Sequence, residues 1–178
     1  TNLRGASSDL IDLTAIGVTE DQLTTETSTV KVRWWPDAEA TVRVSPYGPV
    51  ISDAPLIGFD TSRPMAMRWV GHDATDEITA FLNAAKARDW QGFADAFETY
   101  GVSAQNMLFA GRTDTGHGDI GLVVAAQMPR RTEARPADYI VTDKQARTAW
   151  DNLATSAELP RFKNPDTGIL ASANVPPG

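Results

Sequence analysis

Hydrophobic and polar side chains along the first third of the chain predict paired strands. They alternate over residues 27–35, and the alternation resumes over residues 39–45 after a break at Pro36-Asp37. A period of two is typical of a strand with one buried face, and the break between the two runs favours a hairpin. We therefore expect strands over residues 27–53, followed by a further extended run over residues 65–70.

Helical spacing replaces this alternation between residues 74 and 100. Apolar side chains recur on one stripe in each of two runs, namely Ile78, Phe81, Leu82 and Ala85, and then Phe93, Ala94 and Phe97. Asp73 and Thr75 are the expected N-caps of the first helix, Asp89 is that of the second, and Gly101 ends the pair. We expect a helical pair over residues 74–100 with the second stripe facing inward.

The rest of the chain returns to extended structure and ends on a turn. Residues 106–128 predict two strands around a Gly-rich loop, whereas residues 129–163 predict irregular surface structure. In the turn that follows, Pro165 fixes φ and Gly168 supplies a positive φ, so residues 168–174 are expected to leave it as a strand. With no internal repeats, the predicted fold class is α+β.

Composition narrows the class of protein. The 178 residues are 42% hydrophobic, which is enough to bury a sizeable core in one domain or a large piece of one. The net charge of -7 argues against nucleic-acid binding. The absence of cysteine excludes disulfides and thiolate chemistry, and no apolar run is long enough to span a membrane. The first residues, Thr1 to Gly5, lack the pattern of a signal peptide and read as an interior start.

Two segments carry candidate chemistry. The side-chain amide of Asn174, at the end of the last predicted strand, can donate to a developing oxyanion, or it can simply cap the strand. Asp9 and Asp12 with a carbonyl between them suit a hard cation, although two carboxylates alone are also common in surface turns. The two histidines, His72 and His117, lack ligand spacing.

Four blocks of sequence support a more specific interpretation of the chain. They are Thr1-Asn2 with Asp9 to Leu13, Arg43 to Asp53 around Gly48-Pro49, Asn106 to Arg130 around Ile120-Gly121, and Trp150 to Asn174 around Asn164-Pro165-Asp166-Thr167-Gly168. In order and spacing, the four blocks resemble the penicillin acylase family, whose members are N-terminal nucleophile amidohydrolases. The resemblance covers nearly the whole chain.

The resemblance implies that residues 1–178 are a single internal piece of the β-chain, forming part of an αββα sandwich of mainly antiparallel strands. Asn174 matches the family asparagine that stabilises the oxyanion, and a backbone N–H near Asn2 matches the second donor. Asp9, the carbonyl of Ile11 and Asp12 match part of a structural calcium site, and no organic cofactor is implied. The nucleophile would lie upstream of Thr1, so the piece alone would be inactive.

The expected partners are the remaining β-chain, the α-chain and a small acyl-amide substrate such as a β-lactam side chain or an acyl-homoserine lactone. The family resemblance also implies a periplasmic or extracellular location, and an isolated piece would self-associate through exposed sheet surface. The alternative is a non-catalytic α+β binding or scaffold module. It is favoured by Val175, which stands where the family has a second asparagine, and by the absence of the nucleophile from this chain.

Overall fold

A computed structural model describes residues 7–54, 62–112, 116–131, 140–142 and 145–173. The strands are β1 (Ser8–Asp12), β2 (Thr24–Val30), β3 (Ala38–Ser45), β4 (Gly48–Pro49), β5 (Met65–Trp69), β6 (Gln105–Arg112), β7 (Gly118–Ala125), β8 (Ile140–Val141) and β9 (Arg161–Lys163). The helices are α1 (Glu77–Lys86), α2 (Trp90–Asp95) and α3 (Gln145–Asp151), and single 3-10 turns are η1 (Glu20–Gln22), η2 (Ile51–Asp53) and η3 (Val70–His72). The expected α+β class with mainly antiparallel strands is confirmed, since β1 with β8 is the only parallel pair among the described strands.

Contacts divide the chain, which the sequence predicted as one piece, into two compact units. The β1 unit holds Ser8–Trp69 and Asp138–Ala146, and the α1 unit holds Thr1–Ser7, Val70–Ala137 and Arg147–Gly178. Each unit has its own apolar core.

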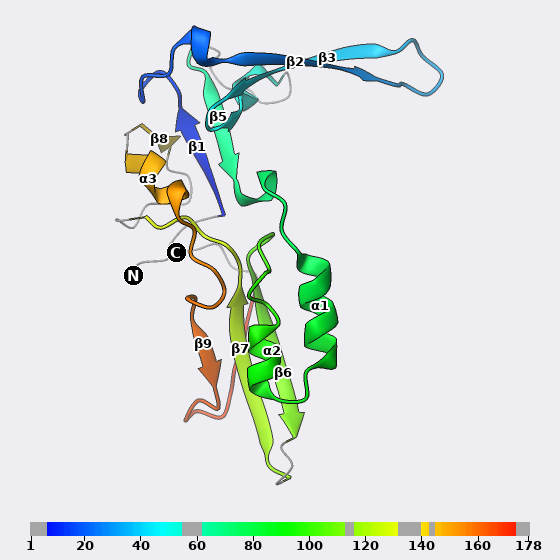
Figure 1. Ribbon diagram of the computed structural model, residues 1–178, viewed down its shortest axis with the longest axis vertical. Helices are drawn as coiled ribbons and strands as arrows, with labels where there is room; N and C mark the ends of the chain where they lie inside the picture. Colours follow the sequence, from blue (N-terminus) through cyan, green and yellow to red (C-terminus); the bar gives the residue numbers. More distant parts are fainter. Residues whose placement is uncertain (1–6, 55–61, 113–115, 132–139, 143–144, 174–178) are drawn as a thin grey trace. The chain divides into compact units, whose positions relative to one another are not determined.

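The core of the β1 unit lies around β1, the middle strand of the sheet β5-β1-β8 (Figure 1). The buried side chains that meet there are Ile11, Leu13, Ile16, Val50, Ala66 and Val141. The sequence pattern does not predict β1 as a strand, because its apolar pair Leu10-Ile11 breaks the alternation. Burial between two partner strands, and not local periodicity, holds this segment extended.

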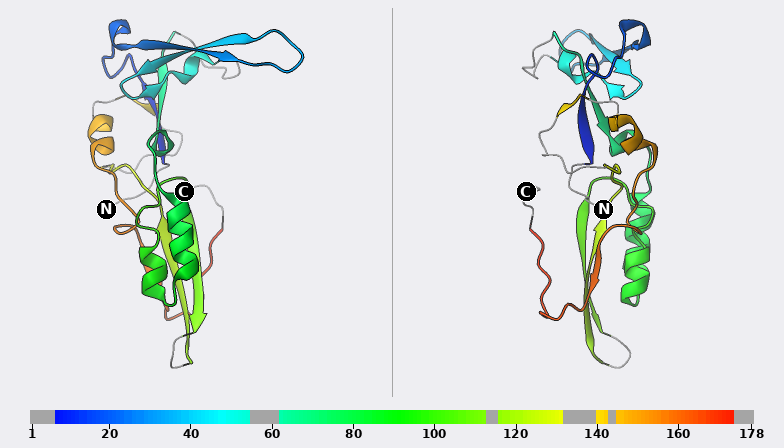
Figure 2. Two further views of the ribbon diagram at one scale, coloured as in Figure 1. Left: turned by 45° about the vertical axis from the view of Figure 1, so that its right-hand side comes forward. Right: turned by 90° about the vertical axis from the view of Figure 1, so that its left-hand side faces the viewer.

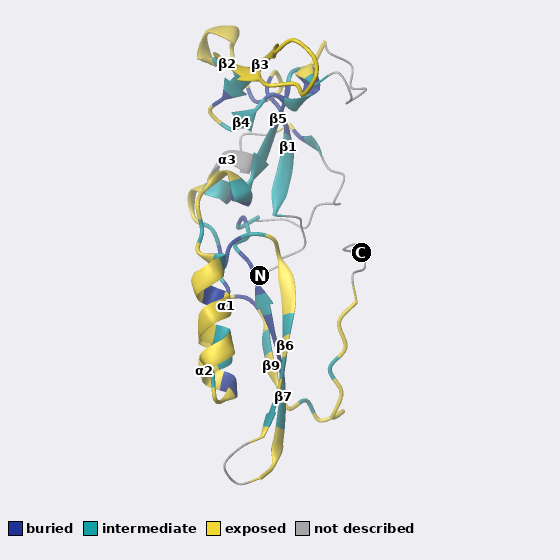
Figure 3. Ribbon diagram, turned by 90° about the vertical axis from the view of Figure 1, so that its right-hand side faces the viewer, coloured by how far each residue is buried: buried dark blue, intermediate teal, exposed yellow. Residues whose placement is uncertain are grey.

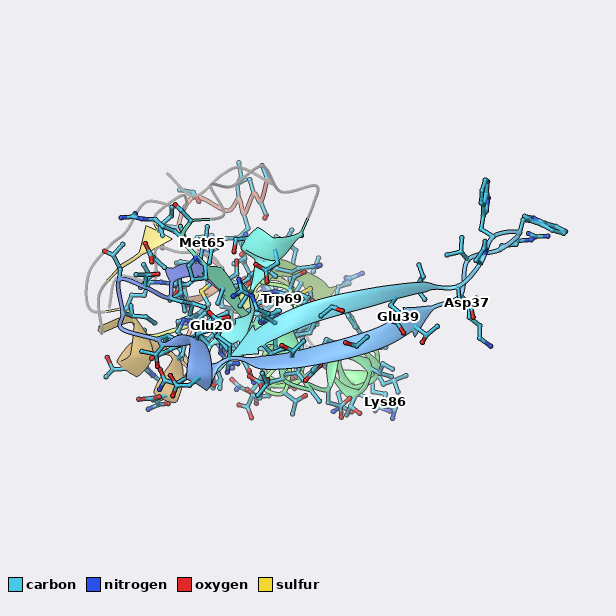
Figure 4. The ribbon with its side chains drawn as sticks, turned by 90° about the horizontal axis from the view of Figure 1, so that it is seen from above. Glu20, Asp37, Glu39, Met65, Trp69 and Lys86 are labelled. Atoms are coloured by element: carbon cyan, nitrogen blue, oxygen red, sulfur yellow. The ribbon has the colours of Figure 1, made fainter. Side chains whose placement is uncertain are left out.

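The hairpin predicted in the β1 unit is present as β2 and β3, which pair from Thr24 with Val44 to Val30 with Ala38. The first strand ends five residues earlier than expected, because residues 31–37 form the connection of the hairpin, which includes Trp34 with a φ of 71° and Pro36. Figure 4 shows the hairpin from above, with Asp37 at its far end. Residues 51–53, expected as strand, form the 3-10 turn η2 instead.

The N-cap of helix α1 differs from the two residues that the sequence predicted. Asp76, and not Asp73 or Thr75, is the N-cap, since its Oδ1 accepts a hydrogen bond from the Thr79 N–H at 3.0 Å. The Glu77 carboxylate then accepts bonds from the Thr75 hydroxyl and from the backbone of residues 101 and 102. These bonds, with Thr75 first, lower the pKa of Glu77 from 4.5 to about 2.

The apolar stripe of α1 is largely uncovered. Ile78, Phe81 and Leu82 are 76%, 50% and 54% exposed, and the buried residue of the helix is Ala80. In α2 the expected cap is confirmed, because Asp89 Oδ1 accepts from the Gly92 N–H at 2.7 Å. The second stripe faces inward as predicted, because Ala94 and Phe97 are buried.

Both helices lie on one side of the antiparallel hairpin β6–β7 (Figure 2). The side chains between helices and sheet are Trp90, Phe93, Phe97, Met107, Phe109, Val123 and Ala125. Gly121 lies directly under Trp90, and a Cβ atom at this position would lie 2.0 Å from Trp90 Cζ3. The family-like Ile120-Gly121 pair therefore marks the point of closest approach between helix and strand.

The region expected to be irregular surface, residues 129–163, contributes to both sheet and core. Arg161–Lys163 forms β9, which extends the sheet beside β7, and Ala154 and Leu159 are buried. The Ser156 hydroxyl accepts a hydrogen bond from the Ala126 N–H at 2.9 Å. Small residues and a three-residue strand leave no periodic signal, which is why the sequence analysis placed this region on the surface.

The face of the β6-β7-β9 sheet away from the helices is open. Leu108, Leu122 and Phe162 form a row across the three strands, in which the outer two are each 51% exposed and the middle residue, Leu122, is buried. Figure 3 shows the exposed backbone of the last described residues on this side of the sheet. Residues 169–173, expected as a strand, form no ladder in the described structure, and Ile169 is 73% exposed. Among the described residues, no helix is long and apolar enough to cross a membrane.

Candidate functional site

Both candidate oxyanion residues, Asn174 and Asn2, lie outside the described residues, as does Thr1. The structure describes the approach to Asn174, which runs from the turn at residues 164–168 to Ala173. The described part of the candidate site therefore consists of this approach and the elements that hold it.

The turn predicted from Asn164-Pro165-Asp166-Thr167-Gly168 is present. The Gly168 N–H donates to the Pro165 carbonyl at 2.8 Å, which closes a four-residue turn. Gly168 has a φ of 67°, and a Cβ there would meet nothing within 4 Å, so backbone conformation and not space favours glycine. Asn164 also has a positive φ, of 46°.

Asn164 joins this turn to β7 through three hydrogen bonds. Its N–H donates to the Ile120 carbonyl at 3.0 Å, and its Oδ1 accepts from the Ile120 N–H at 2.9 Å. Its Nδ2 donates to Asp119 Oδ1 at 2.7 Å, and Lys163 Nζ lies 3.1 Å from the other oxygen of Asp119. The hydrogen bond from Asn164, followed by that from Lys163, lowers the pKa of Asp119.

A second contact holds the far end of the approach. Asn106 Nδ2, on β6, donates to Ser172 Oγ at 3.0 Å. The two contacts bracket the segment, and Figure 2 shows it on the side of the sheet opposite the helices. The sequence predicts the turn but not that Asn106, Asp119 and Asn164 hold it, because the only local signal is an asparagine before a proline.

The three candidate calcium ligands lie on β1. Asp12 is buried, its Oδ1 accepts from the Ala15 N–H at 3.0 Å, and its Oδ2 lies 3.4 Å from Arg63 Nη1. Asp9 is half-buried, and the alternation of a regular strand places it on the face of β1 opposite Asp12. Ile11 pairs with strands on both sides. In the part of the chain that the structure describes, no cluster of three or more His, Cys, Asp or Glu side chains is arranged to hold a metal ion.

The Gly-Pro block has a structural role in the β1 unit. Arg43 makes a bidentate pair with Asp53, through Nε at 2.7 Å and Nη2 at 2.8 Å, and its Nη1 lies 2.9 Å from Glu20. Arg43 thereby ties β3 to η2 and η1 and lowers the pKa of Asp53. Tyr47 packs against the core around Ile11.

Comparison with known proteins finds a matching family and a similar solved structure. The model of the penicillin amidase family matches residues 9–177. Among solved structures, the chain is similar to the thermostable penicillin G acylase from Alcaligenes faecalis in its orthorhombic form, with a TM-score of 0.66 and 24% identity. The match covers 88% of this chain and 27% of that one, so the chain spans about a quarter of that relative's length. No curated protein sequence matches the chain. The family match over nearly the whole chain shows that it belongs to the penicillin amidase family.

Proposed function

We propose that this chain is part of an acyl-amide hydrolase of the penicillin acylase type, in which Asn174 supplies one donor of the oxyanion hole. The observation that carries the proposal is the turn at residues 164–168, which is fastened to β7 in a chain of this family and leads directly to Asn174. A backbone N–H near Asn2 is the proposed second donor.

The proposed reaction begins with an N-terminal nucleophile outside this chain. Its α-amine takes the proton from its own side chain, which attacks the carbonyl carbon of the amide. The carbonyl oxygen becomes an oxyanion, to which the Asn174 amide and the backbone N–H donate. The intermediate collapses to an acyl-enzyme, the amine leaves with the proton, and water then releases the acid. The proposed substrates are β-lactam side-chain amides or acyl-homoserine lactones.

The open sheet face supports the proposed partners. A face with Leu108 and Phe162 half exposed is suited to a second sheet, which the αββα sandwich would supply from the remaining β-chain and the α-chain. In their absence we expect self-association through the same face. The proposed location of the parent enzyme is periplasmic or extracellular, as in the family.

Calcium is proposed only as a partial, structural site. Asp9 and Asp12 face opposite sides of β1, the three residues provide fewer than the six to eight oxygens that calcium takes, and Arg63 already accompanies Asp12. Further ligands would have to come from outside this chain. The residues present therefore predict calcium affinity no better than about millimolar.

The second candidate function, a non-catalytic binding or scaffold module, is favoured by Val175 in place of the second family asparagine. The two functions differ in the reading frame upstream of Thr1, because an enzyme requires a Gly-Ser or similar processing junction there. An upstream frame without such a junction favours the binding module.

Replacement of Asn174 tests the enzymatic proposal directly. In the full-length processed protein, Asn174→Ala should lower kcat by about a hundredfold to a thousandfold with little change in KM, because an oxyanion donor acts on charge that develops in the transition state. The assay is hydrolysis of a chromogenic phenylacetyl or long-chain acyl amide. Wild-type turnover by the variant would make Asn174 a strand cap and favour the binding module. Turnover by the isolated chain would instead identify Thr1 as a nucleophile.

A further inference from the structure

The pairing of β9 with β7 ends at Asn164, where a side-chain oxygen takes the place of a main-chain carbonyl. The Asn164 N–H donates to the Ile120 carbonyl, as the next rung of an antiparallel ladder requires. The return bond from the Ile120 N–H goes to the side-chain Oδ1 of Asn164, where a regular rung would use the main-chain carbonyl. The side chain therefore completes the ladder, and the backbone of Asn164 can adopt its left-handed φ and leave the sheet.

Asp119 determines which way round the Asn164 amide lies. Its carboxylate is an acceptor only, so it binds the Nδ2 end of the amide at 2.7 Å and leaves Oδ1 to the Ile120 N–H. Lys163 pairs with the second oxygen of this carboxylate at 3.1 Å. Each polar atom of the Asn164 side chain thus has one defined partner.

The segment between Asn164 and Asn174 is short and is held at two points. Pro165 follows at once with a fixed φ, and the turn closes at Gly168. The second tether, from Asn106 to Ser172, lies eight residues beyond Asn164 and two residues before Asn174. A change in the backbone at Asn164 is therefore expected to shift the segment that leads to Asn174.

We propose that Asn164, oriented by Asp119, is a positioning residue for the oxyanion donor Asn174. The inference rests on the proposed function. Oxyanion donors act when they lie 2.7–3.1 Å from the position of the oxyanion, and a displacement of about 1 Å can cost about a hundredfold in rate. Loss of the Asn164 contacts should therefore lower kcat and leave KM nearly unchanged, since the segment acts on the transition state and not on substrate binding.

Variants at positions 164 and 119 test this positioning role in the full-length processed enzyme, with a chromogenic phenylacetyl amide as the substrate. Asn164→Ala should lower kcat about tenfold to a hundredfold, with KM within about twofold of the wild-type value. Asn164→Asp should cause a similar loss, because it places a second carboxylate against Asp119. Combining Asn164→Asp with Asp119→Asn restores a donor opposite an acceptor, and kcat should recover to within about threefold of wild type. The matched control is Asn83→Ala, at an exposed position of α1, which should behave as wild type.

The outcomes separate the two proposals. If Asn174→Ala lowers kcat but Asn164→Ala does not, the positioning role is wrong and the proposed function stands. If Asn174→Ala leaves kcat unchanged, the proposed function fails whatever Asn164 does. If thermal melting shows that Asn164→Ala does not fold, the comparison of Asn164→Asp with the paired exchange decides: recovery supports the positioning role, and equal loss in both overturns it.

Discussion

Gly121→Ala should destabilise the α1 unit strongly, although it adds only one methyl group. The new Cβ would lie 2.0 Å and 2.2 Å from two carbons of the Trp90 ring, far inside van der Waals contact. Trp90 is 9% exposed and packs against Phe93 and Phe109, so its ring has no free space into which to retreat. Either β7 moves away from α2 or the indole leaves the core.

These two responses set the lower and upper limits of the expected loss in the free energy of unfolding. Overpacking of a core costs about 1–3 kcal/mol. Complete expulsion of a Trp side chain would return about 150–250 Å² to water, or about 4–6 kcal/mol at 25 cal/mol per Å². We expect a loss of about 2–4 kcal/mol, which for a chain of this size lowers the Tm by about 5–15 °C.

Thermal melting by circular dichroism and urea denaturation measure this loss. The matched control is Gly118→Ala on the same strand, where a Cβ would meet only the Gly111 carbonyl at 3.9 Å. This control should be neutral or slightly stabilising. In a Trp90→Ala background the cost of Gly121→Ala should largely disappear, because the clashing ring is gone. Equal costs for Gly121→Ala in both backgrounds would refute the close approach as its cause.

Three further predictions concern charge, calcium and assembly. Glu77→Gln should lower the free energy of unfolding at pH 7 by about 1 kcal/mol, after allowance for solvent screening. Because the folded pKa of Glu77 is lowered to about 2, this contribution is present above pH 4.5 and lost as the pH falls toward 2, so urea denaturation should show the variant and wild type converge at acid pH. Calorimetry should find calcium affinity in about the millimolar range, and Arg63→Gln should destabilise the chain by leaving Asp12 without its cation; micromolar affinity would contradict the partial site. Light scattering should show self-association of the isolated chain that Leu108→Ser with Phe162→Ser weakens, whereas a monodisperse monomer melting above about 65 °C would count against an open face.

Local chemistry explains what the sequence predicted correctly. Asp89 caps α2 as expected, and the Gly-rich loop between the two extended runs of residues 106–128 correctly indicated the β6–β7 hairpin. The turn before Gly168 followed from proline and glycine alone. Each of these features depends on residues within one turn or one hairpin, so the sequence carries the whole signal.

Features that depend on distant partners were not predictable in this way. The three residues of β9 have no strand signal until β7 lies beside them. The Asn164–Asp119 contact joins positions 45 residues apart, and neither side chain shows in its local sequence that the other will be its partner. In the opposite direction, the apolar stripe of α1 indicated a packed face, but Ile78 is 76% exposed in the described structure. Periodicity identifies a face that is able to pack, and not the surface that covers it.

The open sheet face and the approach to Asn174 lie on the same side of the β6-β7-β9 sheet (Figure 3). In the proposed enzyme, the layer that buries Leu108 and Phe162 would therefore also remove water from the segment that carries the oxyanion donor. A hydrogen bond to a developing oxyanion is worth more in a site without water than in bulk solvent, because water no longer competes for the charge. One packing event would thus stabilise the sheet and make Asn174 effective. A variant that loosens this layer, such as Leu108→Ser in the full-length enzyme, should consequently lower kcat as well as stability.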